Sequence, residues 1–175
     1  MTALEDLLDD YMFRSDSETD RDEKFAELMK AFLRTDDAWA AQFDAVWSWA
    51  EWPGHQGPSN GIDLVARERR TENLVAVQCA FHDPSRPLSK SDLEPFLSAS
   101  NKPPFTARLV VATTDSWNKE LEESIKDQEI PVARVGLTQM LDSSVDWTRF
   151  SSRPTAAVVP SRSPRRTSGP ATVAS

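Results

Sequence analysis

Residues 61–66 (GIDLVA) and residues 75–81 (VAVQCAF) are two short apolar runs joined by a polar stretch. Runs of this length, rich in Val, Ile, Leu and Phe, favour β-strands. Residues 69–73 (RRTEN) between them are suited to a tight turn. The sequence therefore predicts an antiparallel hairpin, and the remaining elements are placed around it.

The hairpin brings particular polar side chains together. Alternate residues of a strand point to the same face of a sheet. Gln78 and Ala80 therefore share one face of the second strand, whereas Cys79 points the other way and is expected in the core. In the first strand Asp63 shares a face with Val65. We expect the two strands to place Asp63 and Gln78 at one site.

In this region the chain resembles the PD-(D/E)XK nuclease superfamily, and more closely the Mrr-like nuclease domain at the N-terminus of Type ISP restriction-modification enzymes. Such relatives carry G-I-D-L-V-A followed by a Q-C-K-F strand. Asp63 and Gln78 match this pattern, but Ala80 stands where the family has lysine. The resemblance runs from about residue 24 to residue 150 and includes residues 47–53 (WSWAEWP), 96–100 (FLSAS), 113–115 (TTD) and 146–147 (DW).

The resemblance implies a Mg²⁺-dependent endonuclease acting on double-stranded DNA. Such a cation is held by hard oxygen ligands, polarises the scissile phosphate and lowers the pKa of the attacking water. The implied protein ligands are Asp63, the side-chain oxygen of Gln78 and the backbone carbonyl of Cys79. The family's lysine orients the water and stabilises charge, which Ala80 cannot do. Loss of one electrostatic donor lowers a rate by about 10²–10³-fold, so strong turnover is not expected.

A helix is predicted upstream of the hairpin, because apolar residues recur at helical spacing in Phe25, Leu28, Met29, Phe32 and Leu33. Similar proteins often have a glutamate near the metal where this chain has Ala26. The nearest acid here is Glu27, about 100° further round the helix, and we do not expect it to substitute. Alanines at positions 26 and 80 fit either a decayed nuclease or one inactivated deliberately, and the sequence does not separate these alternatives.

Two basic residues are candidates for a substitute or for a DNA contact. Lys90 lies in residues 89–92 (SKSD), which read as a helix start with Ser89 or Ser91 as the cap. Arg67 follows the Asp63 strand. A solvated surface charge is the simpler interpretation of both.

Composition and charge limit the class of protein. No apolar run approaches the ~20 residues of a membrane helix, and the N-terminus lacks the features of a signal peptide. We therefore expect a cytoplasmic location and no membrane partner. One cysteine and two histidines argue against a disulfide and against a zinc site. No G-x-x-x-x-G-K-[S/T] loop occurs, so ATP binding is not predicted.

The net charge is −8, and residues 151–175 hold four arginines and no acid, which leaves −12 for residues 1–150. Because nonspecific DNA affinity needs clustered basic groups, the isolated domain is expected to bind DNA weakly. In Type ISP relatives a helicase-like ATPase, a methyltransferase and target-recognition regions follow the nuclease domain. Such modules are the implied partners.

Three segments are predicted: an acidic segment at 1–20, a nuclease-like domain at 21–150 and a disordered tail rich in Pro, Ser and Arg at 151–175. In the first, a short helix over residues 4–12 precedes a linker at 15–20. The domain reads as helix, three strands, helix, strand, helix (116–126), strand, helix. This order indicates an α/β fold with a restriction-endonuclease-like αβββαβ core, in which a mixed sheet is flanked by helices.

Two function classes remain open. The first is a restriction-type DNA endonuclease domain, impaired at Ala80. The alternative is a noncatalytic DNA- or protein-binding remnant of a restriction-modification enzyme. A group of aromatic residues can either stack on bases or pack in the core, and we favour packing for Trp39, Phe43, Trp47, Trp49 and Trp52.

Overall fold

The computed structural model describes residues 2–150, which divide between two compact units. The larger unit is Tyr11–Val145. The described part of the smaller one is residues 2–10 and 146–150, and it includes most of helix α1 (Ala3–Arg14) and the 3-10 turn η1 (Trp147–Phe150). The disorder predicted for residues 151–175 lies outside the described residues.

A five-stranded mixed sheet forms the centre of the larger unit. The strands lie in the order β1-β2-β3-β4-β5, antiparallel from β1 to β3 and parallel from β3 to β5. This confirms the predicted α/β class and mixed sheet. The strands are β1 (Phe43–Ser48), β2 (Leu64–Glu68), β3 (Leu74–Ala80), β4 (Phe105–Ala112) and β5 (Val132–Val135).

The predicted hairpin is β2 and β3, which pair antiparallel with Leu64 opposite Val77. Glu72 adopts a positive φ of 63° in the turn between them. The first strand begins at Leu64, three residues later than the apolar run suggested. The reason is that Gly61, with φ 94°, holds the preceding chain in a turn.

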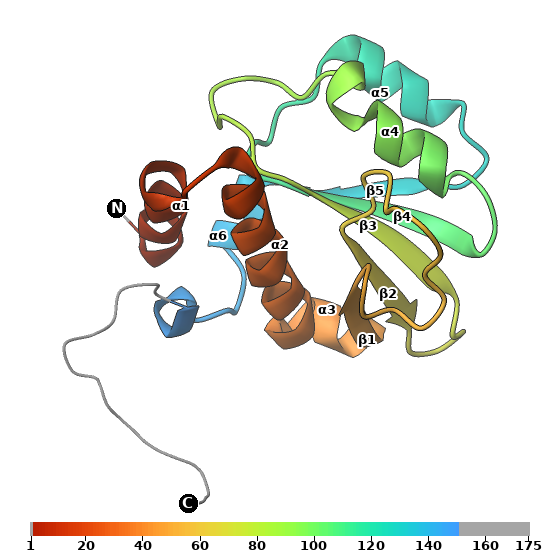
Figure 1. Ribbon diagram of the computed structural model, residues 1–175, viewed down its shortest axis with the longest axis horizontal. Coiled ribbons are helices and arrows are strands. Elements are labelled where there is room, and N and C mark those ends of the chain that lie inside the picture. Colours follow the sequence, from red (N-terminus) through yellow and green to blue (C-terminus); the bar gives the residue numbers. More distant parts are fainter. Residues whose placement is uncertain (1, 151–175) are drawn as a thin grey trace, which may run out of the picture. The chain divides into compact units, whose positions relative to one another are not determined.

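Helix α2 (Glu18–Thr35) covers one face of the sheet, packing against β1 and β3 (Figure 1). Its buried residues include all five members of the predicted apolar stripe. The predicted linker at 15–20 is wrong in its second half, because the Ser17 side chain accepts a hydrogen bond from the Asp20 N–H (3.0 Å) and so starts the helix. The short α3 (Asp37–Gln42) follows and was not predicted.

Helices α4 (Lys90–Ser100) and α5 (Lys119–Lys126) lie together on the opposite face (Figure 1). Ser89 is the N-cap of α4, as predicted, and forms a capping box with Asp92. The helix expected over 116–126 begins later, because the Asn118 side chain accepts from the Leu121 N–H (2.9 Å) and caps the helix there. Helix α6 (Leu137–Leu141) follows β5. None of the described helices is long and apolar enough to span a membrane.

The core between the sheet and α4 includes Val65, Ala76, Phe96 and Val110. Trp52 is also buried there, in agreement with a packing role. A buried arginine closes this layer at one end: Arg108 of β4 is 1% exposed. Its guanidinium donates to the Leu97 carbonyl at the end of α4 (2.9 Å) and to the Ile130 carbonyl before β5 (2.7 Å). Arg108 therefore ties α4 to the segment after α5.

Candidate active site

Asp63 lies immediately before β2 and is held by backbone hydrogen bonds on both sides. Its N–H donates to the Val77 carbonyl of β3 (2.9 Å), and its carbonyl accepts from the Trp49 N–H after β1 (3.1 Å). The turn before it contains two residues with positive φ, Asn60 (53°) and Gly61 (94°). The sheet therefore fixes the backbone of Asp63, while the turn sets the direction from which the chain arrives.

The Asp63 carboxylate lies against β3, where its Oδ2 accepts a hydrogen bond from the Cys79 N–H (2.8 Å). Burial raises the pKa of Asp63 to about 6, the hydrogen bond from Cys79 acts in the opposite direction, and the charge of Asp22 raises the pKa further. Burial also raises the pKa of the Cys79 thiol well above its usual value. Cys79 is thus a core residue, as predicted, with its backbone at the site.

Gln78 precedes Cys79 on β3, and its side-chain Oε1 is buried without a hydrogen-bond partner among the described residues. Strand alternation points Gln78 to the same face as Ala76, which packs in the α4 layer. An unsatisfied buried acceptor costs about 1–3 kcal/mol. An oxygen in this state is available to a cation or to water.

A hollow of ≈700 Å³ opens in front of Asp63, and we call it the Asp63 hollow. Three parts of the larger unit line it: α2, the turn after β1, and the loop that leads to β2. Its lining includes Asp22, Glu23, Ala26, Glu27, Trp49, Ser59 and Asp63. The structure therefore brings Ala26 to the same hollow as Asp63, whereas Gln78 and Ala80 are not among its lining residues.

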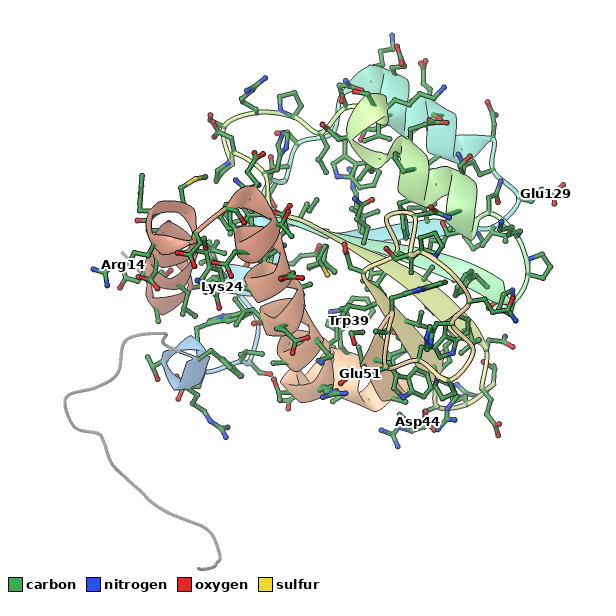
Figure 2. All side chains as sticks on the ribbon, in the orientation of Figure 1. Arg14, Lys24, Trp39, Asp44, Glu51 and Glu129 are labelled. Atoms are coloured by element: carbon green, nitrogen blue, oxygen red, sulfur yellow. The ribbon has the colours of Figure 1, made fainter. Side chains whose placement is uncertain are left out.

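Glu27 reaches the Asp63 hollow but is engaged by a buried lysine. The Lys30 Nζ lies 3.0 Å from a carboxylate oxygen of Glu27 and 3.0 Å from one of Glu51, which is labelled in Figure 2. Burial by itself would lower the pKa of Lys30, but the hydrogen bonds to Glu51 and Glu27 outweigh it and raise the pKa. This pairing directs Glu27 toward Lys30.

The two basic candidates lie elsewhere. Lys90 is the exposed first residue of α4 and does not line the Asp63 hollow. Arg67 of β2 pairs with Asp44 of β1 (Nε–Oδ1 2.8 Å; Asp44 is labelled in Figure 2) and lies over the Trp47 ring. Within residues 2–150 neither side chain forms a hydrogen bond or an ion pair with Asp63, and their proposed roles stay predictions.

Sequence reasoning missed Asp22, which lines the Asp63 hollow and acts electrostatically on Asp63. Its signal was present in the helical spacing. Asp22 precedes Ala26 by four residues, and such pairs lie on the same face of a helix.

A family model described as "Restriction endonuclease" (Mrr_cat_2) matches residues 34–157. The chain belongs to this family. It is a Mrr-like restriction endonuclease domain, and its mixed sheet flanked by helices is the fold expected from the resemblance.

Solved structures similar to this Mrr-like domain include the ATP-dependent Type ISP restriction-modification enzyme LlaBIII bound to DNA. The two share 27% identity with a TM-score of 0.66, over 92% of this chain and 10% of LlaBIII. The DNA modification-dependent restriction endonuclease AspBHI gives 13% identity and a TM-score of 0.48, over 79% of this chain and 34% of AspBHI. The MspJI restriction endonuclease in complex with a 27-mer oligonucleotide gives 16% and 0.47, over 78% and 29%. Curated protein sequences gave no significant match.

Proposed function

We propose that this Mrr-like domain is the DNA-cleaving part of a restriction system, that it hydrolyses phosphodiester bonds with the help of Mg²⁺, and that its turnover is impaired. One observation carries the proposal. The Asp63 carboxylate is partly desolvated, hydrogen-bonded to the backbone of β3 and open to a hollow, in a chain that belongs to a restriction endonuclease family.

The residues present fit a hard divalent cation. Among residues 2–150 no three His, Cys, Asp or Glu side chains converge as a metal-binding group. The donors would be the carboxylate of Asp63, the unpartnered Oε1 of Gln78 and the backbone carbonyl of Cys79, which are the oxygen ligands that Mg²⁺ accepts together with water and phosphate. When bound, such a cation polarises the phosphate and lowers the pKa of a coordinated water.

Two side chains that would assist this chemistry are missing. Ala80, at the end of β3, has no donor to orient a water or to stabilise charge on phosphorus. Ala26 faces the Asp63 hollow but offers no carboxylate. Since removal of one such group typically lowers the rate by about 10²–10³-fold, the chain as it stands would cleave slowly.

Double-stranded DNA is the proposed substrate. LlaBIII, of which this chain spans 10%, is ATP-dependent and bound to DNA. The −12 charge of residues 1–150 argues for weak binding by the isolated domain. We therefore propose that helicase and methyltransferase modules of a cytoplasmic restriction system deliver the DNA to it.

A plasmid-nicking assay with Mg²⁺ or Mn²⁺ tests the proposal. Ala80→Lys and Ala26→Glu are compared singly and together, and the double replacement is expected to raise metal-dependent nicking well above the starting chain. Asp63→Asn in the double-replacement background should abolish the gain. A folded double variant that shows no gain when supplied with its targeting modules would contradict the assignment.

A second candidate function is favoured by the same two alanines. The chain could be a noncatalytic DNA- or protein-binding remnant that keeps the fold without the chemistry. The nicking assay separates the two, because a remnant would bind its partner equally well with and without metal and would gain no cleavage from the double replacement.

A further inference from the structure

A second hollow, of ≈390 Å³, lies beside β1 at the edge of the sheet, and we call it the arginine hollow. Helix α3 and the end of α2 lie next to β1 here (Figure 1). The lining of the hollow includes Arg34, Ala40, Phe43, Asp44, Trp47 and Arg69. Arg34 belongs to the last turn of α2, and Arg69 follows the end of β2. Two guanidinium groups from distant parts of the sequence therefore meet at one hollow.

Both guanidinium groups are anchored to main-chain carbonyls. The Arg34 Nε donates to the Val46 carbonyl of β1 (3.1 Å), and its Nη2 group donates to the same oxygen. The Arg69 Nη2 group donates to the carbonyls of Ala40 (3.0 Å) and Phe43 (3.2 Å). Because these bonds order two long side chains in advance, less conformational freedom is lost when a ligand binds to them.

Each guanidinium also keeps donors that no described residue uses. Of the five N–H donors of an arginine, those of the Nη1 group of Arg34 and of the Nε and Nη1 groups of Arg69 have no acceptor within residues 2–150. Neither guanidinium forms an ion pair with a carboxylate in that range, whereas Arg21, Arg67 and Arg134 do. Both residues are exposed, so a solute reaches the remaining donors.

The arginine hollow is positively charged, although residues 1–150 together carry −12. Asp44 is the acid among its lining residues, and its carboxylate is paired with Arg67 (Nε–Oδ1 2.8 Å). Three guanidiniums are thus set against one carboxylate, which leaves two positive charges in excess. Forked guanidinium donors match the oxygens of a phosphate in geometry and in charge. The chemistry of the hollow therefore selects a phosphate group.

The arginine hollow lies further along α2 than the Asp63 hollow. Ala26 lines the Asp63 hollow, and Arg34, eight residues later on the same helix, lines the arginine hollow. At about 1.5 Å per residue, this interval is about 12 Å. Charges on one strand of duplex DNA recur about every 3.4 Å along its axis, so the interval corresponds to roughly three to four base pairs.

We propose that Arg34 and Arg69 bind a backbone phosphate of duplex DNA, roughly three to four base pairs from the phosphate that faces Asp63. This inference rests on the proposed function and deepens it, because it names where an acidic domain contacts its substrate. Phosphate contacts fix the register and orientation of a protein on the duplex without reading its sequence. The two arginines are therefore positioning residues for cleavage at Asp63.

The experiment measures binding of a short fluorescent DNA duplex to the full chain by fluorescence anisotropy, at several salt concentrations and without divalent metal. The variants are Arg34→Gln, Arg69→Gln and the double replacement. Arg70→Gln is the matched control, because it removes the same charge from an exposed neighbour that does not line the arginine hollow. Arg69→Lys keeps the charge without the forked donors. Circular dichroism melts establish that each variant is folded.

Each single replacement by glutamine in the hollow is expected to weaken duplex binding about tenfold, the effect of losing a charge-assisted hydrogen bond. The double replacement should also reduce the slope of log affinity against log salt by about 1, as loss of one phosphate contact does. Arg70→Gln should change the affinity by less than about twofold and leave the slope unchanged, because salt screens an exposed charge that touches no phosphate. Arg69→Lys should keep the slope of the unmodified chain.

Equal affinities and salt slopes for the double replacement and Arg70→Gln would overturn the inference, and so would a lack of duplex binding by the unmodified chain at low salt. Inorganic phosphate is titrated in parallel by calorimetry. If it binds through Arg34 and Arg69 while the duplex does not, the hollow holds a free anion and the inference is overturned. The proposed function fails in a different assay, namely if Ala80→Lys with Ala26→Glu gives no metal-dependent nicking. The two failures are distinguishable, because the anisotropy measurement involves neither metal nor cleavage.

Discussion

Replacing Asp63 by asparagine should make the domain more stable at neutral pH, by an amount that follows from the burial of its carboxylate. The pKa of Asp63 is raised from 3.8 to about 6, chiefly by burial. A carboxyl group with a raised pKa favours folding below its unfolded pKa, and this contribution is lost as the pH rises through the folded pKa. The difference corresponds to up to about 3 kcal/mol of unfolding free energy.

Asparagine does not titrate, and its side-chain oxygen can still accept the hydrogen bond from the Cys79 N–H. The stability difference between Asp63→Asn and the unmodified chain should therefore grow by up to about 3 kcal/mol between pH 3 and pH 7. For a domain of this size that is about 6–12 °C in Tm.

Urea and thermal melts at several pH values, without divalent metal, give the difference directly, and the other titrating groups largely cancel in it. A pH-independent difference would refute the inference that the Asp63 carboxylate is desolvated. In that case the electrostatic basis of the candidate site would also be lost.

Two further predictions concern the scaffold. Arg108→Met leaves the Leu97 and Ile130 carbonyls without the guanidinium donor. It should lower the unfolding free energy by about 2–4 kcal/mol in urea melts. A change below about 0.5 kcal/mol, the level of an ordinary surface substitution, would show that the guanidinium is dispensable. Gly61→Ala places a Cβ 3.1 Å from the Phe96 nitrogen at φ 94°, whereas Gly57→Ala (φ 64°) meets open space. Gly61→Ala should lower the unfolding free energy by about 2 kcal/mol or more and weaken binding of Tb³⁺, a hard-cation probe of the proposed metal site, beside Asp63. Gly57→Ala should lower it by about 1 kcal/mol and leave Tb³⁺ binding unchanged. Equal effects of the two variants would contradict the role given to the contact between residue 61 and Phe96.

The parts of the fold that repeat a pattern could be predicted from the sequence. The apolar stripe of α2 follows from several residues at helical spacing, and the β2–β3 hairpin follows from two apolar runs of strand length joined by a polar turn. The start of α2 was placed too late, since one side-chain hydrogen bond from the Asp20 N–H to Ser17 outweighs the polar composition of that segment. The six residues of α3 are too few to show a period, and they were missed.

The candidate site was predictable in part, because its residues belong to different elements. The hairpin places Asp63 against the backbone next to Gln78, and strand pairing predicts this proximity. Asp22 is more than 40 residues from Asp63 in the sequence, and its approach depends on how α2 packs over the sheet. The engagement of Glu27 by Lys30 likewise depends on Glu51, which lies in the turn after β1. Such contacts between distant segments leave no local pattern.

The hydrogen bonds that hold Asp63 all join backbone or carboxylate atoms of the sheet and its immediate extensions, at Trp49, Val77 and Cys79. None of them involves the side chain of residue 26 or residue 80. A lineage carrying this chain could therefore lose or regain cleavage by changing those two side chains while the framework that aims the carboxylate stays as it is. Under the proposed function, the architecture that holds Asp63 would be the same in a slow and in a fast form of this domain, and two substitutions would separate them.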